Sequence, residues 1–136
     1  MRILIAEDEV TIARVLKVML EKNKYAVDMV HNGNDALDYI QATTYDALVL
    51  DIMMPGPNGY QTCRKIRELS NAPILFLSAR TKESDKTLGF SSGGDDYLAK
   101  PFSYNELISR SKALIRRYQV YKGNLGKSRT VYVVWI

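Results

Sequence analysis

Strand-like runs and helix-like segments alternate along most of the chain. Runs typical of strands are predicted at residues 2–6, 26–30, 46–50, 73–77 and 96–99, and apolar residues recur at helical spacing after each run. Strict alternation of this kind predicts a parallel sheet with helices on both faces. Because crossovers between parallel strands are right-handed, few topologies remain. We predict a doubly wound α/β sheet of five strands in the order 2-1-3-4-5, with five helices.

The run at 46–50 is expected at the centre of this sheet. After its first residue it is continuously apolar, which is typical of a strand buried on both faces. Asp51 follows it directly, and the prolines and glycines at 55–59 then require a loop. An acidic residue is thereby placed where a buried strand opens into a loop. The strand order and the central burial together predict a flavodoxin-like fold.

Two predicted helices have clear apolar stripes, and one is weak. The stripes are Tyr60, Cys63, Ile66 and Leu69 for the helix after the loop, and Leu107, Leu114, Ile115 and Tyr118 for the last helix. Ser103 can cap the last helix, with Glu106 in capping-box position three residues later. The helix predicted at about 82–92 has few large apolar residues and adjoining glycines, so its local stability should be low.

The composition is that of a folded, soluble chain, with 46% hydrophobic and 25% charged residues. No apolar run approaches the ~20 residues that cross a bilayer. The first residues turn acidic too early for a secretion signal. With one cysteine, Cys63, no intrachain disulfide can form. We therefore expect a cytoplasmic protein without a membrane partner, and Cys63 in its core.

The net charge of +4 comes from the end of the chain. All fifteen acidic residues and fifteen of the nineteen basic ones lie within residues 1–116, which are therefore neutral. Without a basic face to follow phosphates, the chain is not expected to bind nucleic acid unaided. We assign residues 1–120 to one domain and 121–136 to a linker or tail. The uncharged, β-prone run at 130–136 could be an added strand, a contact between chains or a truncated next domain.

Residues that can carry chemistry follow the predicted strands at one edge of the sheet. Glu7 and Asp8 follow the first strand, Asp51 the third, Ser78 the fourth and Lys100 the fifth. Sheets of this kind bind ligands outside the carboxyl ends of their strands, where the strand order reverses, here between strands one and three. Each residue alone could be an ordinary loop or surface residue. Their joint arrangement predicts one acidic site.

Three converging carboxylates would repel one another unless a cation joined them. Mg²⁺, or Mn²⁺ in its place, binds carboxylate oxygens, a backbone carbonyl and water, and the carbonyl of Met53 is a plausible donor. The neutralised site could then admit a phosphoryl group, for which Asp51 is the natural nucleophile. Lys100 and the hydroxyl of Ser78 would stabilise the phosphoryl oxygens.

These residues lie in segments that resemble the receiver domains of bacterial two-component response regulators. The segments are Ile-Leu-Ile-Ala-Glu-Asp-Glu at 3–9, Leu-Val-Leu-Asp-Ile-Met-Met-Pro at 48–55, Asn-Gly at 58–59, Ser-Ala-Arg at 78–80, and Gly-Gly-Asp-Asp-Tyr-Leu-Ala-Lys-Pro-Phe at 93–102. The resemblance implies that Asp51 accepts a phosphoryl group from a sensor histidine kinase. It also implies that Asp8, Asp51 and the Met53 carbonyl bind Mg²⁺, with Glu7 assisting through water. Such a domain catalyses only its own phosphorylation and dephosphorylation and is not otherwise an enzyme.

The resemblance also implies a switch. After phosphorylation the hydroxyl of Ser78 would move toward the new oxygens, and the ring of Tyr97 would turn inward. The Lys100-Pro101 peptide bond would be cis, which is otherwise uncommon. Met53 and Arg80 would tune the lifetime of the phosphate.

The sequence of residues 95–102 is most similar to the corresponding segment of the OmpR/PhoB class of transcription factors. In that class the face formed by the fourth helix, fifth strand and fifth helix pairs two active receivers, which implies a homodimer after phosphorylation. The residues on that face would be Lys86, Asp95, Asp96, Glu106 and Arg110; a solvated charged surface is the alternative. A DNA-binding domain should follow, but residues 122–136 do not resemble its start, so DNA would be bound only through a separate domain. Gly94 stands where alanine is usual and should loosen the end of the fourth helix.

Other classes of protein fit the sequence less well. A pseudo-receiver that only docks partners would lack an acid, the lysine or the hydroxyl, and none is missing. A phosphatase of the haloacid dehalogenase type needs a second Asp two residues after the nucleophile, where this chain has Met53. A P-loop protein needs a Gly-x-x-x-x-Gly-Lys run, which is absent. A flavodoxin needs a phosphate-cradling loop after the first strand, where the acidic run at 7–9 stands.

Overall fold

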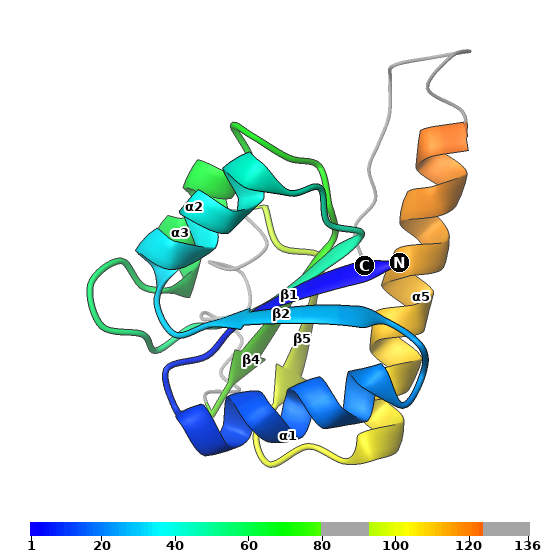
Figure 1. The fold of residues 1–136 in the computed structure, drawn as a ribbon, viewed down its shortest axis with the longest axis horizontal. Helices are drawn as coiled ribbons and strands as arrows, with labels where there is room; N and C mark the ends of the chain where they lie inside the picture. The colour runs from blue at the N-terminus through cyan, green and yellow to red at the C-terminus, as the bar shows by residue number, and fades with distance from the viewer. Residues whose placement is uncertain (80–92, 124–136) are drawn as a thin grey trace.

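A five-stranded parallel sheet forms the centre of the fold (Figure 1). The computed structural model describes residues 1–79 and 93–123. The strands are β1 (Arg2–Ala6), β2 (Ala26–Val30), β3 (Ala47–Asp51), β4 (Ile74–Ser78) and β5 (Asp96–Ala99), in the order β2-β1-β3-β4-β5. The predicted fold class and strand order are confirmed. β3 and β4 each begin and end one residue later than predicted.

Helices cover both faces of the sheet (Figure 1). α1 (Val10–Glu21) and α5 (Tyr104–Gly123) lie on one face, and α2 (Gly33–Ala42) and α3 (Gly59–Ile66) on the other. The helix predicted at 82–92 lies outside the described residues. α5 continues through Gly123, so the first three residues of the predicted linker are helical. The remainder of that linker and the run at 130–136 also lie outside the described residues.

Alternate residues of each strand fill two separate hydrophobic cores. One core, under α2 and α3, includes Leu4, Leu48, Leu50, Ile74 and Phe76; the other, under α1 and α5, includes Ile3, Ile5, Val49, Leu75 and Leu77. Every residue of β3 is buried, as its continuous apolar run predicted, and every residue of β4 is buried as well. Burial of each such Leu or Ile contributes about 1.5–3 kcal/mol to the free energy of folding. The central strands are therefore held firmly, and a functional side chain at their ends has a well-defined position.

Tight packing brings the start of α3 against the end of β3. A Cβ at Gly59 would lie 2.6 Å from the carbonyl oxygen of Asp51, so only glycine allows this approach. The N–H of Gly59 donates to the carbonyl of Ile52 at 2.9 Å. Asn58 and Gln61 form a reciprocal capping box at the same helix start, with two hydrogen bonds of 2.9 Å. The loop after Asp51 is therefore short and well anchored.

The two predicted helix stripes are largely confirmed. Tyr60, Cys63 and Ile66 are buried on α3, and Leu107, Leu114 and Ile115 on α5. Leu69 was predicted in the α3 stripe, and this is wrong: α3 ends at Ile66, and Leu69 is 50% exposed. The N–H of Glu106 donates to Ser103 Oγ at 3.0 Å, as expected for the cap of α5.

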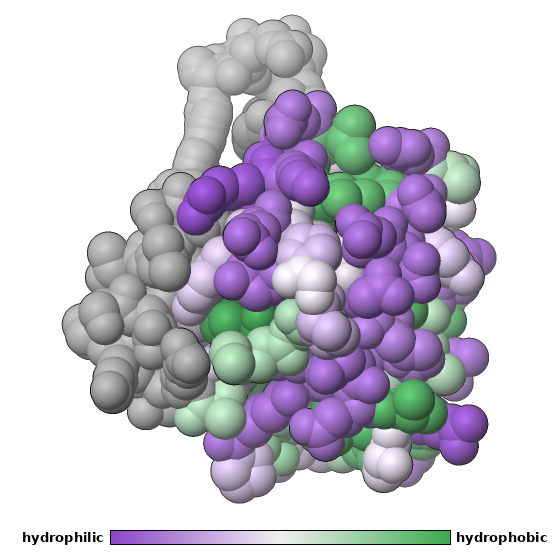
Figure 2. Space-filling model, turned by 90° about the vertical axis from the view of Figure 1, so that its left-hand side faces the viewer, coloured by the Kyte–Doolittle hydropathy of each residue, from purple (hydrophilic) through white to green (hydrophobic). Residues whose placement is uncertain are grey.

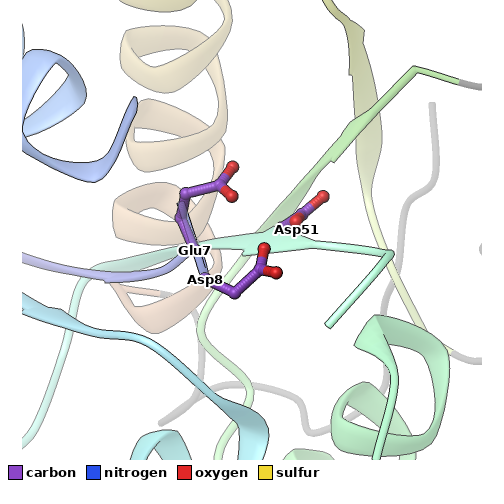
Figure 3. A group of neighbouring side chains, drawn as sticks. All are labelled: Glu7, Asp8 and Asp51. Atoms are coloured by element: carbon purple, nitrogen blue, oxygen red, sulfur yellow. The ribbon is translucent and has the colours of Figure 1, made fainter. Parts of the chain in front are cut away.

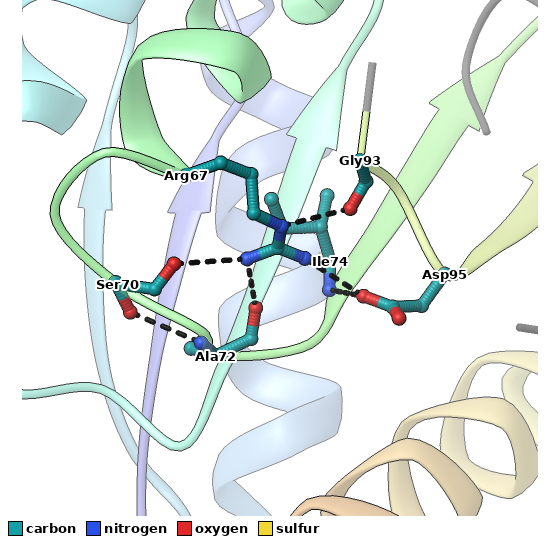
Figure 4. Close-up of polar contacts among 6 residues, drawn as sticks. All are labelled: Arg67, Ser70, Ala72, Ile74, Gly93 and Asp95. Carbon is teal, nitrogen blue, oxygen red and sulfur yellow. Dashed lines mark hydrogen bonds and ion pairs between the residues drawn. The ribbon is translucent and has the colours of Figure 1, made fainter. Parts of the chain in front are cut away.

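Arg67, which follows α3, binds several segments at the amino ends of β4 and β5, at the end of the sheet opposite the acidic residues (Figure 4). Its guanidinium donates to the backbone carbonyls of Gly93, Ser70 and Ala72 at 2.9, 3.2 and 2.7 Å. It also pairs with Asp95 Oδ2 at 2.9 Å, and the same oxygen accepts the N–H of Ile74 at 2.8 Å. Asp95 was predicted on a dimer face, but its carboxylate is engaged within its own chain.

The surface seen in Figure 2 is mainly hydrophilic, with hydrophobic residues in small separate groups. This side of the molecule lies at the left of Figure 1, where α2 and α3 are found. Within residues 1–79 and 93–123, every helix is too short or too polar to cross a lipid bilayer.

Gly94 is required by the packing of an aromatic ring. A Cβ at this position would lie 2.1 Å from Cε2 and 2.7 Å from Cδ2 of Phe76, which is fully buried. The sequence suggested that Gly94 loosens the fourth helix, a segment outside the described residues. In the part that is described, Gly94 instead makes room for Phe76.

We expect Gly94→Ala to lower the free energy of unfolding by about 1–3 kcal/mol, because the added methyl overpacks the core against Phe76. Urea denaturation measures this change. Adding Phe76→Leu should recover part of the loss, so that the double variant is more stable than the two single losses predict. An unchanged denaturation midpoint in Gly94→Ala would contradict this account.

Candidate functional site

Three carboxylates meet where β1 and β3 end side by side (Figure 3). The register pairs Ala6 with Leu50, so the residues that follow leave the sheet together. One oxygen each from Glu7, Asp8 and Asp51 lies within 4.8 Å of the others. Glu7 and Asp51 are buried and Asp8 is half-buried. The predicted convergence of these three residues is confirmed.

Lys100 reaches this group from the end of β5. Its Nζ lies 2.8 Å from Glu7 Oε1 and 3.4 Å from Asp51 Oδ1, and its side chain is only 17% exposed. The sequence predicted that Lys100 joins the site, but it did not predict Glu7 as its nearest partner. The Lys100-Pro101 peptide bond is cis, as predicted.

Ser78 and Tyr97 occupy neighbouring strands beside the acidic group. Ser78 is fully buried at the end of β4, one residue beyond Leu77, which is paired with Asp51. Its carbonyl accepts the N–H of Lys100 at 2.8 Å. Tyr97 is 8% exposed and lies in the core under α2 and α3. The ring therefore lies inside the molecule.

Two backbone groups adjoin the carboxylates. The N–H of Met53 points at Asp51 Oδ1 at 3.4 Å, while the Met53 side chain is 53% exposed. The N–H of Glu9 donates to Glu7 Oε2 at 3.1 Å. Arg80 and Lys86, both predicted to have functional roles, lie outside the described residues.

Sequence reasoning missed two contacts near the site. The predicted site did not include His31, whose Nδ1 lies 2.9 Å from the backbone carbonyl of Glu7. Tyr60 was interpreted only as a core residue, yet its hydroxyl lies 2.7 Å from that of Tyr97. The alternation of strands did give a signal for His31, because it follows β2, which is the neighbour of β1 in the sheet.

The charges of the site are unbalanced. Burial, together with the neighbouring Glu7 carboxylate, raises the pKa of Asp51 to about 7, although Lys100 opposes this shift. Burial lowers the pKa of Lys100, but the carboxylates of Glu7 and Asp51 outweigh it and raise that pKa overall. One lysine therefore faces three acids, and the group favours a further positive charge.

The residues fit a hard divalent cation. Glu7 is fully buried, and the Lys100 ammonium, 2.8 Å from Glu7 Oε1, is shared with Asp51, so one positive charge serves two buried carboxylates. Every side chain of the group offers carboxylate oxygen, the ligand that Mg²⁺ prefers. Among the described residues, this arrangement can hold a cation and place a carboxylate nucleophile beside it.

Residues 3–112 match the response regulator receiver domain family. The chain belongs to this family. It is the receiver domain of a two-component response regulator, and its signalling is based on phosphorylation. Domains of this family interact with histidine kinases and are not enzymes in the usual sense.

Two curated relatives are similar to this receiver domain. The transcriptional regulatory protein ResD of Bacillus subtilis (strain 168) is 44% identical over 116 residues, which are 85% of this chain and 48% of ResD. The response regulator ArlR of Staphylococcus aureus (strain Mu50 / ATCC 700699) is 42% identical over 116 residues, which are 85% of this chain and 53% of ArlR. Both are response regulators of the OmpR/PhoB class, so the predicted resemblance to that class is confirmed. The chain spans about half the length of these relatives.

Solved receiver domains have the same fold. The receiver domain of the Francisella response regulator 1452 is 38% identical with a TM-score of 0.81, covering 85% of this chain and 97% of that one. The receiver domain of the sensor histidine kinase PA1611 from Pseudomonas aeruginosa PAO1 is 32% identical with a TM-score of 0.78, with the same coverage of 85% and 97%. That structure has a magnesium ion coordinated in its active site cleft.

The raised pKa of Asp51 predicts how stability depends on pH without metal. Asp51 holds its proton up to about pH 7 when folded but only to about pH 4 when unfolded, so its contribution to stability is present below pH 4 and is lost as pH rises through 7. We expect Asp51→Asn to raise the free energy of unfolding by roughly 1–3 kcal/mol at pH 8, and by less at pH 5. Urea denaturation in EDTA at both pH values measures this.

The exposed Asp38 provides a matched control for this prediction. Asp38→Asn removes the same charge from an exposed helix surface, where burial does not oppose the charge, so it should change stability little at either pH. An equal effect of Asp51→Asn at pH 5 and pH 8 would contradict the assigned pKa shift.

Proposed function

We propose that Asp51 accepts a phosphoryl group from a sensor histidine kinase and that the resulting aspartyl phosphate activates the domain. The observation that carries this proposal is the meeting of Glu7, Asp8, Asp51 and Lys100 at the ends of three strands. A carboxylate oxygen of Asp51 attacks phosphorus, while the leaving atom of the donor takes the electrons of the bond that breaks. The complete set of groups argues against a pseudo-receiver that docks partners without being phosphorylated.

Mg²⁺ is the proposed cofactor, held by Asp8, Asp51 and the backbone carbonyl of Met53, with Glu7 assisting through water. When bound, it would offset the carboxylate repulsion and the charge of the phosphoryl oxygens. The all-oxygen donor set and the buried Glu7 Oε1 support this assignment.

Lys100 and Ser78 have proposed roles in the transfer. The ammonium of Lys100 already lies between Glu7 and Asp51, so a small rotation would bring it to a phosphoryl oxygen bound to Asp51. The hydroxyl of Ser78 would bind a second phosphoryl oxygen. By these means the domain would catalyse its own phosphorylation and later its own dephosphorylation. Ser78 and Tyr97 would together form the switch that responds to the phosphate.

We also propose that the active domain forms a homodimer through the face of β5 and α5. Arg110 Nη1 lies 2.9 Å from both carboxylate oxygens of Asp96, and the Arg110 side chain is 42% exposed. Such a pair can exchange partners with a second copy, and the exposed Glu106 lies on the same helix. Asp95 is left out of this proposal because Arg67 already binds it. Transcription would be controlled through a separate DNA-binding domain.

Phosphorylation is tested by incubating the protein with Mg²⁺ and a small phosphodonor and measuring the intact mass. We expect the parent to gain one phosphoryl group and Asp51→Asn to gain none. Asp8→Asn should retain the nucleophile but react at least about tenfold more slowly, because it removes a metal ligand. Asp38→Asn, exposed on α2, should react like the parent. A phosphoryl gain in both the parent and Asp51→Asn would place the acceptor elsewhere.

The dimer is tested by sedimentation with beryllofluoride, which mimics the phosphoryl group. We expect Arg110→Glu to weaken the dimer at least about tenfold, since it replaces the positive partner of Asp96 with a second negative charge. Lys112→Glu makes the same charge change on α5 but beside Met1 and Tyr25, away from β5, and should leave the dimer unchanged. Equal weakening by both variants would argue against this face.

A further inference from the structure

The hydroxyl groups of two tyrosines meet inside the core under α2 and α3. Tyr60 on α3 is 6% exposed, Tyr97 on β5 is 8% exposed, and their oxygens lie 2.7 Å apart in a buried hydrogen bond. A buried hydroxyl that loses its partner costs free energy, so each tyrosine stabilises the inward position of the other. Tyr60 comes from a different element than Ser78, the proposed partner of Tyr97 in the switch.

A third ring holds this pair in place. Phe76 on β4 packs edge-on against Tyr60, with ring centroids 5.2 Å apart and an interplanar angle of 78°. The same ring packs against Tyr97 at 5.4 Å and 43°. Phe76 itself fills the space left by the missing side chain of Gly94. The ring of Tyr97 therefore has a defined place within the core.

Tyr60 also connects this place with the acidic site. It follows Gly59, whose Cα packs so closely on Asp51 that a Cβ would lie 2.6 Å from the Asp51 carbonyl oxygen. On the other side, the N–H of Tyr97 donates to Asp96 Oδ1 at 2.8 Å, and Arg110 binds the same oxygen at 2.9 Å. A continuous series of contacts thus leads from Asp51 through the start of α3 and Tyr97 to the β5–α5 face.

We propose that Tyr60 is a positioning residue for Tyr97. Its hydroxyl, 2.7 Å from that of Tyr97, holds the Tyr97 ring in the inward position, which is the arrangement that phosphorylation is proposed to favour. This inference rests on the proposed function, because it assumes that Tyr97 reports on the state of Asp51. It adds a residue on α3 that sets the resting balance of the switch.

Tyr60→Phe tests the proposal because it removes the hydroxyl and keeps the ring that packs on Phe76. In the unphosphorylated protein, NMR contacts between the ring of residue 97 and the ring of Phe76 measure the inward population. We expect the ratio of inward to outward rings to fall about fivefold, the value of one neutral hydrogen bond. The dimer formed with beryllofluoride should weaken by up to the same factor, because more of the binding free energy is used to turn the ring inward.

Two further variants separate positioning from general stability. Tyr97→Phe breaks the same hydrogen bond from its other end and should give the same fall, and adding Tyr60→Phe to it should change nothing more. Tyr45→Phe also removes a buried hydroxyl, which donates to Asp28 at 2.6 Å, but Tyr45 does not belong to this pair. It should lower stability without changing the ring population.

The outcomes distinguish this proposal from the proposed function. Tyr60→Phe should still gain one phosphoryl group at Asp51, so a failure of phosphorylation in the parent would sink the proposed function and leave the ring measurement valid. The positioning role is overturned if Tyr60→Phe leaves the inward ratio unchanged. It is also overturned if Tyr45→Phe lowers that ratio equally, or if the effects of Tyr60→Phe and Tyr97→Phe simply add.

Discussion

The repulsion among three carboxylates at the ends of β1 and β3 is the constraint on which this structure depends. Glu7 and Asp51 are buried with Asp8 beside them, and one lysine cannot neutralise all three. The free energy that holds them together comes from the two strands, whose apolar residues fill both cores. Because the sheet cannot relax, added positive charge or a change at Asp51 must alter contacts elsewhere.

The rules of parallel sheets made much of the fold and site predictable from the sequence. An apolar run that ends at Asp51 can only be a central strand, and its neighbours then bring Glu7 and Lys100 to the same edge. No comparable rule fixes the residue at which a helix ends or the partner that a long side chain contacts. Leu69 continued the α3 pattern but lies beyond the last turn, and the Tyr60 hydroxyl meets that of Tyr97 only because ring packing sets both rotamers.

α3 links the carboxyl ends of the strands with their amino ends although it is only eight residues long. Its first residue, Gly59, packs on the backbone of Asp51, while Arg67 after its end binds Asp95 just before β5. The Asp95 pair is half-buried and shares its oxygen with the N–H of Ile74, which makes it costly to break. The Arg67 end is therefore anchored, and movement at the Asp51 end would be absorbed within the first turn, where Tyr60 lies.

β5 is the strand best able to respond to such movement. It is a short edge strand, whereas β3 is held by neighbours on both sides. Successive side chains of a strand point to opposite faces, and accordingly Tyr97 enters the core under α3 while Asp96 pairs with Arg110 of α5. The N–H of Tyr97 donates to Asp96 Oδ1 at 2.8 Å, so the backbone of Tyr97 is a direct link between the core ring and the surface ion pair. The strand geometry thus offers a short path by which an event inside the core can change the placement of charge on the surface.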